Sequence, residues 1–263
     1  MAVTYDSDLY QIPRGRVFFD PYDGSDALTG ERPFGNCPGL TVNIETESAE
    51  HFSSTTGLRE KDASVLLQVT RTGTLTCDNM STTNVGMWIS GTESTVTQAS
   101  TPVANEPHTV IQGRFYQLGY STSNPGGARN IGSVVVTNSA GSTTYDITDD
   151  YLLDTAMGRI QIVEGGAIAS GGAQVIHVDY TPTATTWERV SSGAVAELFG
   201  ALRIVADNAT AVDRDFYMPY VSLKPSGELP IIAEGTDFAS MTFTVEVLKP
   251  ANMEAIYVDG RPA

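Results

Sequence analysis

The 263-residue chain is predicted to be an all-β protein with one short helix, and three features of the sequence support this prediction. Apolar and polar residues alternate over several short segments, which is the pattern of half-buried strands. Thr, Ser and Val are abundant between turn-forming glycines and prolines. Hydrophobic residues make up 41 % of the chain, enough for a packed core. We therefore expect a β-sandwich or barrel-like core, with a small β module inserted into it or appended to it.

The first elements follow from local pattern. Residues 1–13 are polar and end in Ile12-Pro13, which predicts an N-terminal arm without a core of its own. A strand is expected at 17–19, and the Asp-rich stretch after it is typical of a turn. Leu40, Val42 and Ile44 alternate with polar residues up to Glu47, so 40–47 should be a half-buried strand with an acidic outer face.

A second alternating segment covers residues 63–76, with Val65, Leu67 and Val69 on one side and threonines on the other. The stretch between the two strands, 48–62, is densely charged and has no period. Together they predict a long hairpin whose tip is a functional loop.

The next region predicts one helix and a module. Residues 81–89 should form a short helix capped by Ser81 or Thr82, with Val85, Trp88 and Ile89 towards the core. Residues 92–107 resemble a linker in composition, and glycine pairs then separate short strand patterns up to residue 180. The expected strands are 133–136, 143–147, 158–163 and 173–180.

The domain organisation follows from this change in texture. Residues 113–182 should form an inserted small β module, and residues 14–112 and 183–263 a discontinuous core domain. In the second part of the core, strands are expected at 201–206, 216–224 and 239–248, with a turn at 224–228. The last strand alternates cleanly between apolar and polar side chains.

The charge balance excludes several functions. Asp and Glu number 31 against 15 Lys and Arg, a net charge of −16. No basic stripe is visible, so specific binding of nucleic acid is disfavoured. No apolar run reaches transmembrane length, and the N-terminus lacks the pattern of a signal peptide. Cys37 and Cys77 make no disulfide framework; they are either free thiols or a pair on neighbouring strands.

No residue pattern predicts an enzyme, a cofactor or a metal ion. His51, His108 and His177 are scattered, without metal-ligand spacing. The acids between Asp20 and Asp26 depart from the register of a calcium loop and fit a turn. One remote alternative is a hydrolase that uses the carboxylates of residues 149–154, where glycoside cleavage would need two acids around one bond. The three carboxylates are Asp149, Asp150 and Asp154.

The polar faces of the alternating strands allow two interpretations. In an isolated sandwich, such a face is simply solvated. In a ring-forming protein, such a face could line a channel for DNA. Hydroxyls and carboxylates offer a phosphate group neither a cationic contact nor an apolar surface. The candidate lining residues are Glu45, Glu47, Thr70, Thr72, Thr74 and Glu246.

Several motifs resemble those of siphophage major tail tube proteins, and the likeness covers most of the chain. They lie at residues 15–20 (GRVFFD), 30–38 (GERPFGNCP), 44–47 (IETE), 50–62 (EHFSSTTGLREKD), 151–154 (YLLD), 158–160 (GRI), 165–168 (GGAI), 178–180 (VDY) and 224–229 (KPSGEL). The resemblance implies a tail tube fold and a structural virion protein, whose hexameric rings stack into a hollow tube that conducts genomic DNA.

The resemblance also implies roles and partners. The strands 40–47 and 63–76 would form the inner barrel, the loop between them would reach the adjacent ring, the N-terminal arm would help stacking, and the 113–182 module would be displayed outside. Partners would be further copies of the chain, the tape measure, tail tip and terminator proteins, and DNA that passes without specific binding, with no membrane. Localisation would be the phage tail, after synthesis in the host cytoplasm. The candidate stacking residues are His51, Phe52, Leu58, Arg59, Glu60 and Lys61.

The alternative from another class is a β-rich surface adhesin or carbohydrate-binding module. The lack of a secretion signal and of clustered aromatic residues counts against it.

Overall fold

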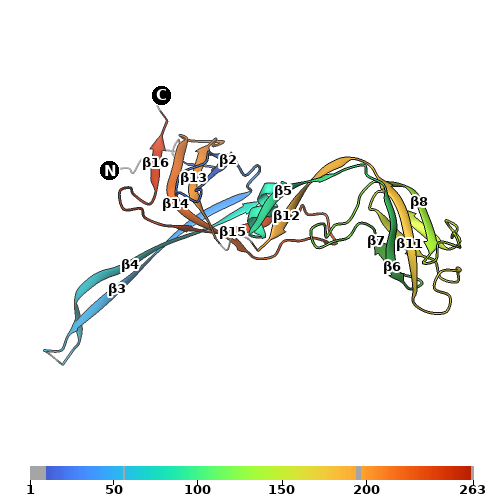
Figure 1. Ribbon diagram of the computed structural model, residues 1–263. Helices are drawn as coiled ribbons and strands as arrows, with labels where there is room; N and C mark the ends of the chain where they lie inside the picture. The colour runs from blue at the N-terminus through green and yellow to red at the C-terminus, as the bar shows by residue number, and fades with distance from the viewer. Residues whose placement is uncertain (1–9, 56, 194–196, 262–263) are drawn as a thin grey trace. The chain divides into compact units, whose positions relative to one another are not determined.

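The computed structural model describes residues 10–55, 57–193 and 197–261, and it divides the chain into two compact units. Unit 1 comprises Met1–Ser94 and Val190–Ala263, and unit 2 comprises Thr95–Arg189. Strands dominate both units, and one helix lies among the described residues (Figure 1). The prediction of an all-β protein with one short helix is therefore confirmed.

Unit 1 is built on one antiparallel sheet of eight strands. Their order is β2–β1–β13–β14–β15–β4–β3, and the eighth strand, β16, pairs with β14. The strands are β1 (Gly15–Pro21), β2 (Arg32–Pro33), β3 (Gly39–Ser53), β4 (Glu60–Cys77), β13 (Leu198–Ala206), β14 (Arg214–Ser226), β15 (Met241–Val247) and β16 (Tyr257–Gly260).

The core of unit 1 lies on one face of this sheet. On β15, Met241, Phe243 and Val245 are fully buried, while the residues between them are only half-buried. The ring of Phe243 packs against Phe34, with centroids 5.8 Å apart. The alternation predicted for this strand is confirmed, because one face of β15 is buried and the other is not.

The helix α1 (Thr82–Trp88) covers part of this core and begins as predicted. The Ser81 hydroxyl caps it by accepting a hydrogen bond from the Asn84 amide. The Asn84 side chain is buried and donates to the carbonyl of Phe34 at 2.8 Å. Cys77 is buried next to this side chain, and both it and the half-buried Cys37 are free thiols.

The β3–β4 hairpin is longer than predicted and extends beyond the core (Figure 1). The prediction of an aperiodic loop over 48–62 is wrong, since β3 runs to Ser53 and β4 begins at Glu60. The distal strands are exposed on both faces, so their side chains need not alternate between apolar and polar. Backbone pairing continues along them to the tip.

A β-bulge makes the two faces of β4 differ from the predicted ones. The register shifts where Glu47 pairs with Gln68 and Ser48 pairs with Leu66, so Leu67 is the extra residue. Val65 then lies opposite Ala49, on the other face from Val69. The prediction that 65, 67 and 69 lie on one side of the strand is therefore wrong, and all three side chains are exposed.

Residues 92–107, which the sequence predicted to be a linker, lie largely in strands. Strand β5 (Gly91–Gln98) pairs with β12 (Thr185–Ser192) in a two-stranded sheet. Strand β6 (Val103–Val110) belongs to unit 2 and pairs there with residues 174–182. The polar composition of this segment is like that of a linker. The segment nevertheless forms strands, because it pairs with strands that are distant in the sequence.

Unit 2 contains two three-stranded sheets, β7–β10–β9 and β6–β11–β8, which share one apolar core. Its structural boundaries are wider than the predicted 113–182, because β6 supplies buried Val110 to that core. The strand predicted at 143–147 is wrong, since this segment makes only isolated bridges. The remaining strands are β7 (Phe115–Gln117), β8 (Ile131–Asn138), β9 (Tyr151–Asp154), β10 (Arg159–Ile162) and β11 (Gln174–Pro182).

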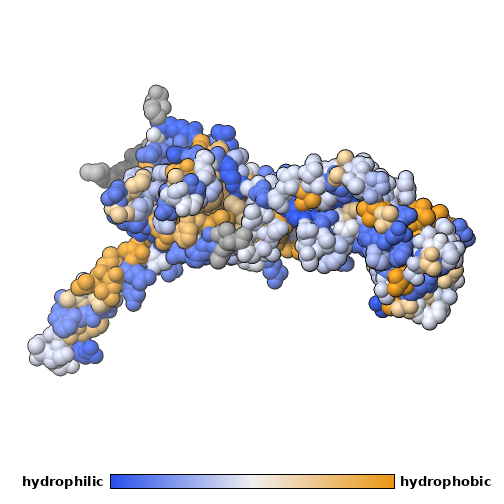
Figure 2. All heavy atoms as spheres, viewed as in Figure 1, coloured by the Kyte–Doolittle hydropathy of each residue, from blue (hydrophilic) through white to orange (hydrophobic). Residues whose placement is uncertain are grey.

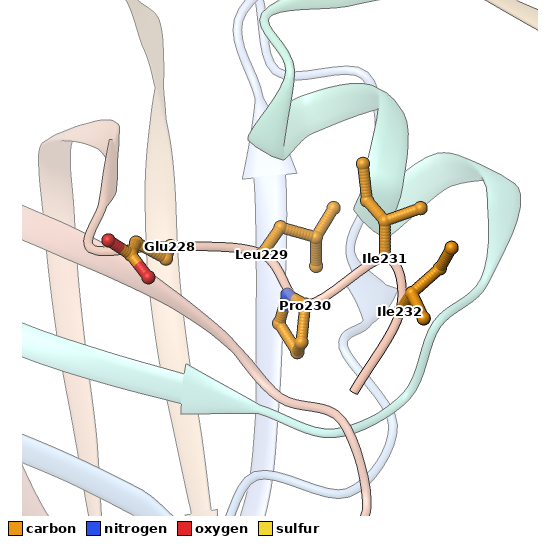
Figure 3. A pocket seen from close by; sticks show the side chains of 5 residues that line it. All are labelled: Glu228, Leu229, Pro230, Ile231 and Ile232. Carbon is orange, nitrogen blue, oxygen red and sulfur yellow. The ribbon is translucent and has the colours of Figure 1, made fainter. Parts of the chain in front are cut away.

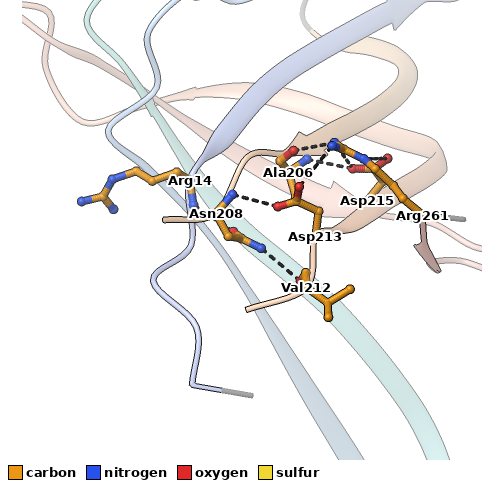
Figure 4. A network of polar contacts seen from close by, with 7 residues as sticks. All are labelled: Arg14, Ala206, Asn208, Val212, Asp213, Asp215 and Arg261. Carbon is orange, nitrogen blue, oxygen red and sulfur yellow. Dashed lines mark hydrogen bonds and ion pairs between the residues drawn. The ribbon is translucent and has the colours of Figure 1, made fainter. Parts of the chain in front are cut away.

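The loop between β13 and β14 holds segments from both ends of the described chain (Figure 4). The backbone amide of Arg14 donates to the Asn208 side chain at 3.1 Å, and the Asn208 amide donates to Asp213 at 2.8 Å. The guanidinium of Arg261 donates to Asp213 and Asp215 at 3.2 Å each. This pairing lowers the pKa of Asp215.

The predicted N-terminal arm falls mostly outside the described residues, which begin at Tyr10. The described part lies on the same loop. Ile12 donates its amide to the Thr210 hydroxyl at 3.2 Å, and this hydroxyl donates to the Tyr10 carbonyl at 2.9 Å.

Candidate functional site: the β3–β4 hairpin

The structure gathers all six predicted lining residues on one face of the unit 1 sheet. Directly opposite residues of an antiparallel pair share a face, as do alternate residues of one strand. Glu45 lies opposite Thr70, and Thr72 lies opposite Glu246 on its other side. The remaining two, Glu47 and Thr74, alternate onto the same face, which we call the polar face.

The charge of the polar face is uneven. On β14, the Nζ of Lys224 contacts Glu246 at 3.0 Å and Glu197 at 3.1 Å, and these contacts raise the pKa of Lys224. Glu45 and Glu47 instead have Thr70 and Gln68 opposite them. The negative charge of the face is therefore compensated near the core and uncompensated along the hairpin.

Sequence reasoning placed Lys224 at the end of the predicted strand 216–224 and in the following turn, but missed its place on the polar face. It lies on β14 opposite Thr244, so its place on the polar face depends on the pairing of β14 with β15. No local pattern reveals that pairing. The alternation of β15 would have placed Lys224 on the polar face only if β14 had been known to pair with β15.

The opposite face of the hairpin carries an exposed apolar strip, which we call the hairpin strip. It continues the core face beyond Leu40. The exposed fractions of Ile44 and Leu66 are 57% and 58%. Hydrophobic residues gather visibly along this hairpin in Figure 2. The strip consists of Val42, Ile44, Leu66 and Val69.

The exposure of this strip corrects the predicted half-buried strand at 40–47. Leu40 alone among its apolar residues packs on the core of unit 1. Val42 and Ile44 lie beyond the end of that core. Exposed apolar patches of this kind mark interaction surfaces.

The six predicted stacking residues lie at the hairpin tip, but only Leu58 and Arg59 are in the loop. His51 and Phe52 belong to β3, and Glu60 and Lys61 to β4.

Contacts across the hairpin hold this tip together. His51 Nδ1 lies 2.5 Å from a carboxylate oxygen of Asp62, and Lys61 forms an ion pair with Glu50. The Arg59 guanidinium lies 5.4 Å from the ring centroid of Phe52. The charged residues therefore stabilise a two-stranded tip instead of a flexible loop.

The position of β3 leaves one edge of the sheet open. In the described part of the chain, β3 is the last strand, paired only with β4. A 15-residue edge strand offers unpaired N–H and C=O groups along its length. Such an edge can pair with another chain unless it is covered.

The loop between β14 and β15 carries a further apolar surface that sequence reasoning missed. Ile231, Ile232 and Phe238 are 89%, 94% and 94% exposed. Figure 3 shows Leu229 to Ile232 as a continuous apolar run beside Glu228, lining an open pocket. No periodic pattern singles out this loop, because it is neither helix nor strand.

Two of the three carboxylates considered for catalysis, those of Asp150 and Asp154, accept hydrogen bonds from nearby backbone amides. Asp150 accepts hydrogen bonds from the amides of Ala167 at 2.7 Å and Asp146 at 3.0 Å. Asp154 accepts from the Met157 amide at 3.0 Å. Asp23 likewise accepts from two amides within its own turn, which fits the predicted turn. In the described ranges, no group of three or more His, Cys, Asp or Glu is placed to hold a metal ion.

Two of the three histidines contact carboxylates. Besides His51 at the hairpin tip, His108 Nε2 lies 2.8 Å from Glu106 in unit 2. The Tyr180 hydroxyl donates to the same carboxylate at 2.6 Å. Burial raises the pKa of Glu106, but hydrogen bonds from His108, Tyr180 and Gly119 outweigh this effect and lower it.

A family model described as "Protein of unknown function UCP028589" matches residues 10–255. No curated protein matches the chain. Within the described residues, no helix has the length and apolar character needed to cross a membrane.

Proposed function

The chain belongs to the family described as Protein of unknown function UCP028589, and we propose that it is a structural protein that assembles through its β3–β4 hairpin. The assembly would be a ring, and stacked rings would form the hollow tail tube of a bacteriophage. The observation that carries this proposal is the hairpin itself. Its 15- and 18-residue strands extend beyond the core and carry an exposed apolar strip.

Closure into a ring explains the open edge of β3. Side-by-side copies would cover each edge with the next sheet, and a closed barrel has no edge left. Because one surface of a copy meets a different surface of the next, the contact repeats until the ring closes. The resemblance to siphophage tail tube proteins supports stacking of such rings.

The size of the strip sets the expected strength of one contact. Completing the burial of a half-exposed aliphatic side chain contributes on the order of 1 kcal/mol. Four such side chains give about 4 kcal/mol, the lower end of the ~4–15 kcal/mol lost in association. A single contact should therefore be weak, and assembly should need high concentration or nucleation by the tape measure, tail tip or terminator proteins.

The polar face supports a channel that DNA crosses without being bound. Glu45 and Glu47 have no cation opposite them, and threonines fill much of the rest. Symmetry would repeat these carboxylates around a ring. A phosphate backbone would find no cationic contact there, and binding requires such contacts. Under this proposal, the protein acts in the virion after synthesis in the host cytoplasm, with no catalytic step.

The test is assembly of the purified chain, followed by sedimentation velocity and negative-stain microscopy. We expect rings or tubes whose fraction rises with concentration. Ile44→Asp should abolish them while the monomer stays folded, because Ile44 is exposed in the monomer and lies opposite Arg71. Val175→Asp, an exposed strand position in unit 2, is the matched control and should assemble normally. Wild-type monomers at every concentration, with tail components added, would refute the proposal.

A further inference from the structure

The loop of residues 227–240, between β14 and β15, exposes three large apolar side chains. Its anchor is Leu229, which packs against the core, whereas Ile231, Ile232 and Phe238 are almost fully exposed (Figure 3). Nothing in the described part of the chain covers these three side chains. Three large apolar side chains exposed together in one short loop indicate a contact surface.

The charges of this loop restrict what it can contact. It contains Glu228, Glu234 and Asp237, and it has no lysine or arginine. A fitting partner surface is therefore apolar and carries positive charge.

The hairpin strip has this composition. Ile44 lies directly opposite Arg71, which shares the face of the strip. Between Leu40 and Ser48 that face has no carboxylate, since Glu45 and Glu47 point to the polar face. Arg71 also interacts electrostatically with Glu254, whose carboxylate accepts a hydrogen bond from the Nζ of Lys249 at 2.8 Å.

We propose that the 227–240 loop of one copy packs on the hairpin strip of the next copy, with Ile231, Ile232 and Phe238 against the strip and an acid of the loop beside Arg71. This inference rests on the proposed self-assembly and names its contact. Both surfaces belong to unit 1, and both are exposed in the same chain. A loop-to-strip contact is heterologous, so each copy keeps one loop and one strip for its two neighbours.

Cross-linking between differently tagged copies tests the contact. One copy carries Ile44→Cys and the other Ile232→Cys, both in a Cys37→Ser/Cys77→Ser background, and a short bismaleimide is added to the mixed assembly. We expect a cross-linked heterodimer that carries both tags. Val175→Cys in place of Ile44→Cys is the control and should give none.

The outcomes separate this inference from the proposed function. Assemblies that form normally but give no product with Ile44→Cys, nor with Leu66→Cys in its place, overturn the loop-to-strip contact and leave self-assembly intact. A background protein and a wild type that both stay monomeric overturn self-assembly itself.

Charge exchange provides a second measurement that needs no cysteine. Arg71→Glu alone should reduce the assembled fraction at low salt at least tenfold, because it opposes like charges. The triple change Glu228→Lys/Glu234→Lys/Asp237→Lys, combined with Arg71→Glu in one chain, should restore assembly. No restoration in a folded protein would contradict the contact.

Discussion

Glu246 on β15 lies directly opposite Thr72 on β4, and the same Thr72 lies opposite Asn43 on β3. This row makes the polar face one continuous surface across three strands. Lys224 extends it to β14 and compensates Glu246 there. Because no such cation accompanies Glu45 and Glu47, the negative potential of the face should be strongest along the hairpin.

The core of unit 1 depends on the packing of Phe243, which is fully buried against Phe34. Phe243→Ala should lower the free energy of unfolding of unit 1 by about 3–5 kcal/mol, since it removes a buried ring and leaves a cavity. Thr244→Ala on the same strand should change it by less than about 1 kcal/mol. Denaturant unfolding followed by Trp88 fluorescence, in a Trp187→Phe background, measures both.

Trp88 is a suitable reporter because it packs against this core and its Nε1 donates to the Thr242 carbonyl at 3.1 Å. Equal destabilisation by Phe243→Ala and Thr244→Ala would mean that burial does not distinguish the two faces of β15.

This strand also shows what the sequence could predict. One face of β15 is buried and the other is not, so period-2 alternation revealed both the strand and its core residues. The start of the helix at Ser81 was equally predictable, because a residue with a capping hydroxyl can be recognised from the local sequence.

The candidate site was only partly predictable for physical reasons. The polar face could be proposed from alternation, but Lys224 joins it through a strand pairing that local sequence does not encode. The distal hairpin has two exposed faces, so no period distinguishes strand from loop over 48–62. A bulge then moved Val65 to the face opposite Val69.

The part of unit 2 between β5 and β12, residues 99–184, should be removable. A chain in which an Asn-Gly turn joins Gln98 to Thr185 keeps β5 paired with β12, and it should fold and still assemble. Deleting 113–182 instead leaves β6 without β11 and exposes Val110, so that protein should aggregate. Solubility, circular dichroism and microscopy of the two proteins check this. A soluble but assembly-deficient first protein would show that unit 2 contributes to the assembly contact.

Glu106 should make unit 2 sensitive to acid. Its carboxylate is mostly buried and accepts hydrogen bonds from Tyr180 and Gly119, so Glu106→Gln should cost about 1–3 kcal/mol at neutral pH. The pKa of Glu106 is lower in the folded state than its ordinary value of 4.5. Its contribution is therefore complete above pH 4.5 and is lost as the pH falls through the folded-state pKa.

Amide hydrogen exchange of β6 and β11 in wild type and variant, from pH 7 to pH 3, measures this contribution. The difference between the two proteins should shrink below pH 4.5. Glu164→Gln, at an exposed position of the same unit, is the control and should change little. A difference that stays constant to pH 3 would show that hydrogen bonding to Glu106 does not depend on its charge.

The last prediction concerns the polar face as a DNA-repelling surface. Wild-type assemblies should not bind duplex DNA at low salt, whereas Glu45→Lys/Glu47→Lys assemblies should bind it. The two substitutions together change the charge of each copy by four, and a ring repeats this change in every copy. DNA phosphates then gain cationic contacts, and binding releases the counterions of the DNA. Binding should weaken steeply as salt rises, since the Debye length is about 10 Å at 0.1 M. Fluorescence anisotropy of labelled DNA measures both effects.

The control Asp149→Lys/Glu164→Lys carries the same charge change on unit 2 and leaves the residues of the polar face unchanged. In particles that carry this chain, the hairpin variant should also slow DNA ejection at low salt while the control does not. Equal DNA binding and equal ejection by the two variants would place Glu45 and Glu47 outside the DNA path.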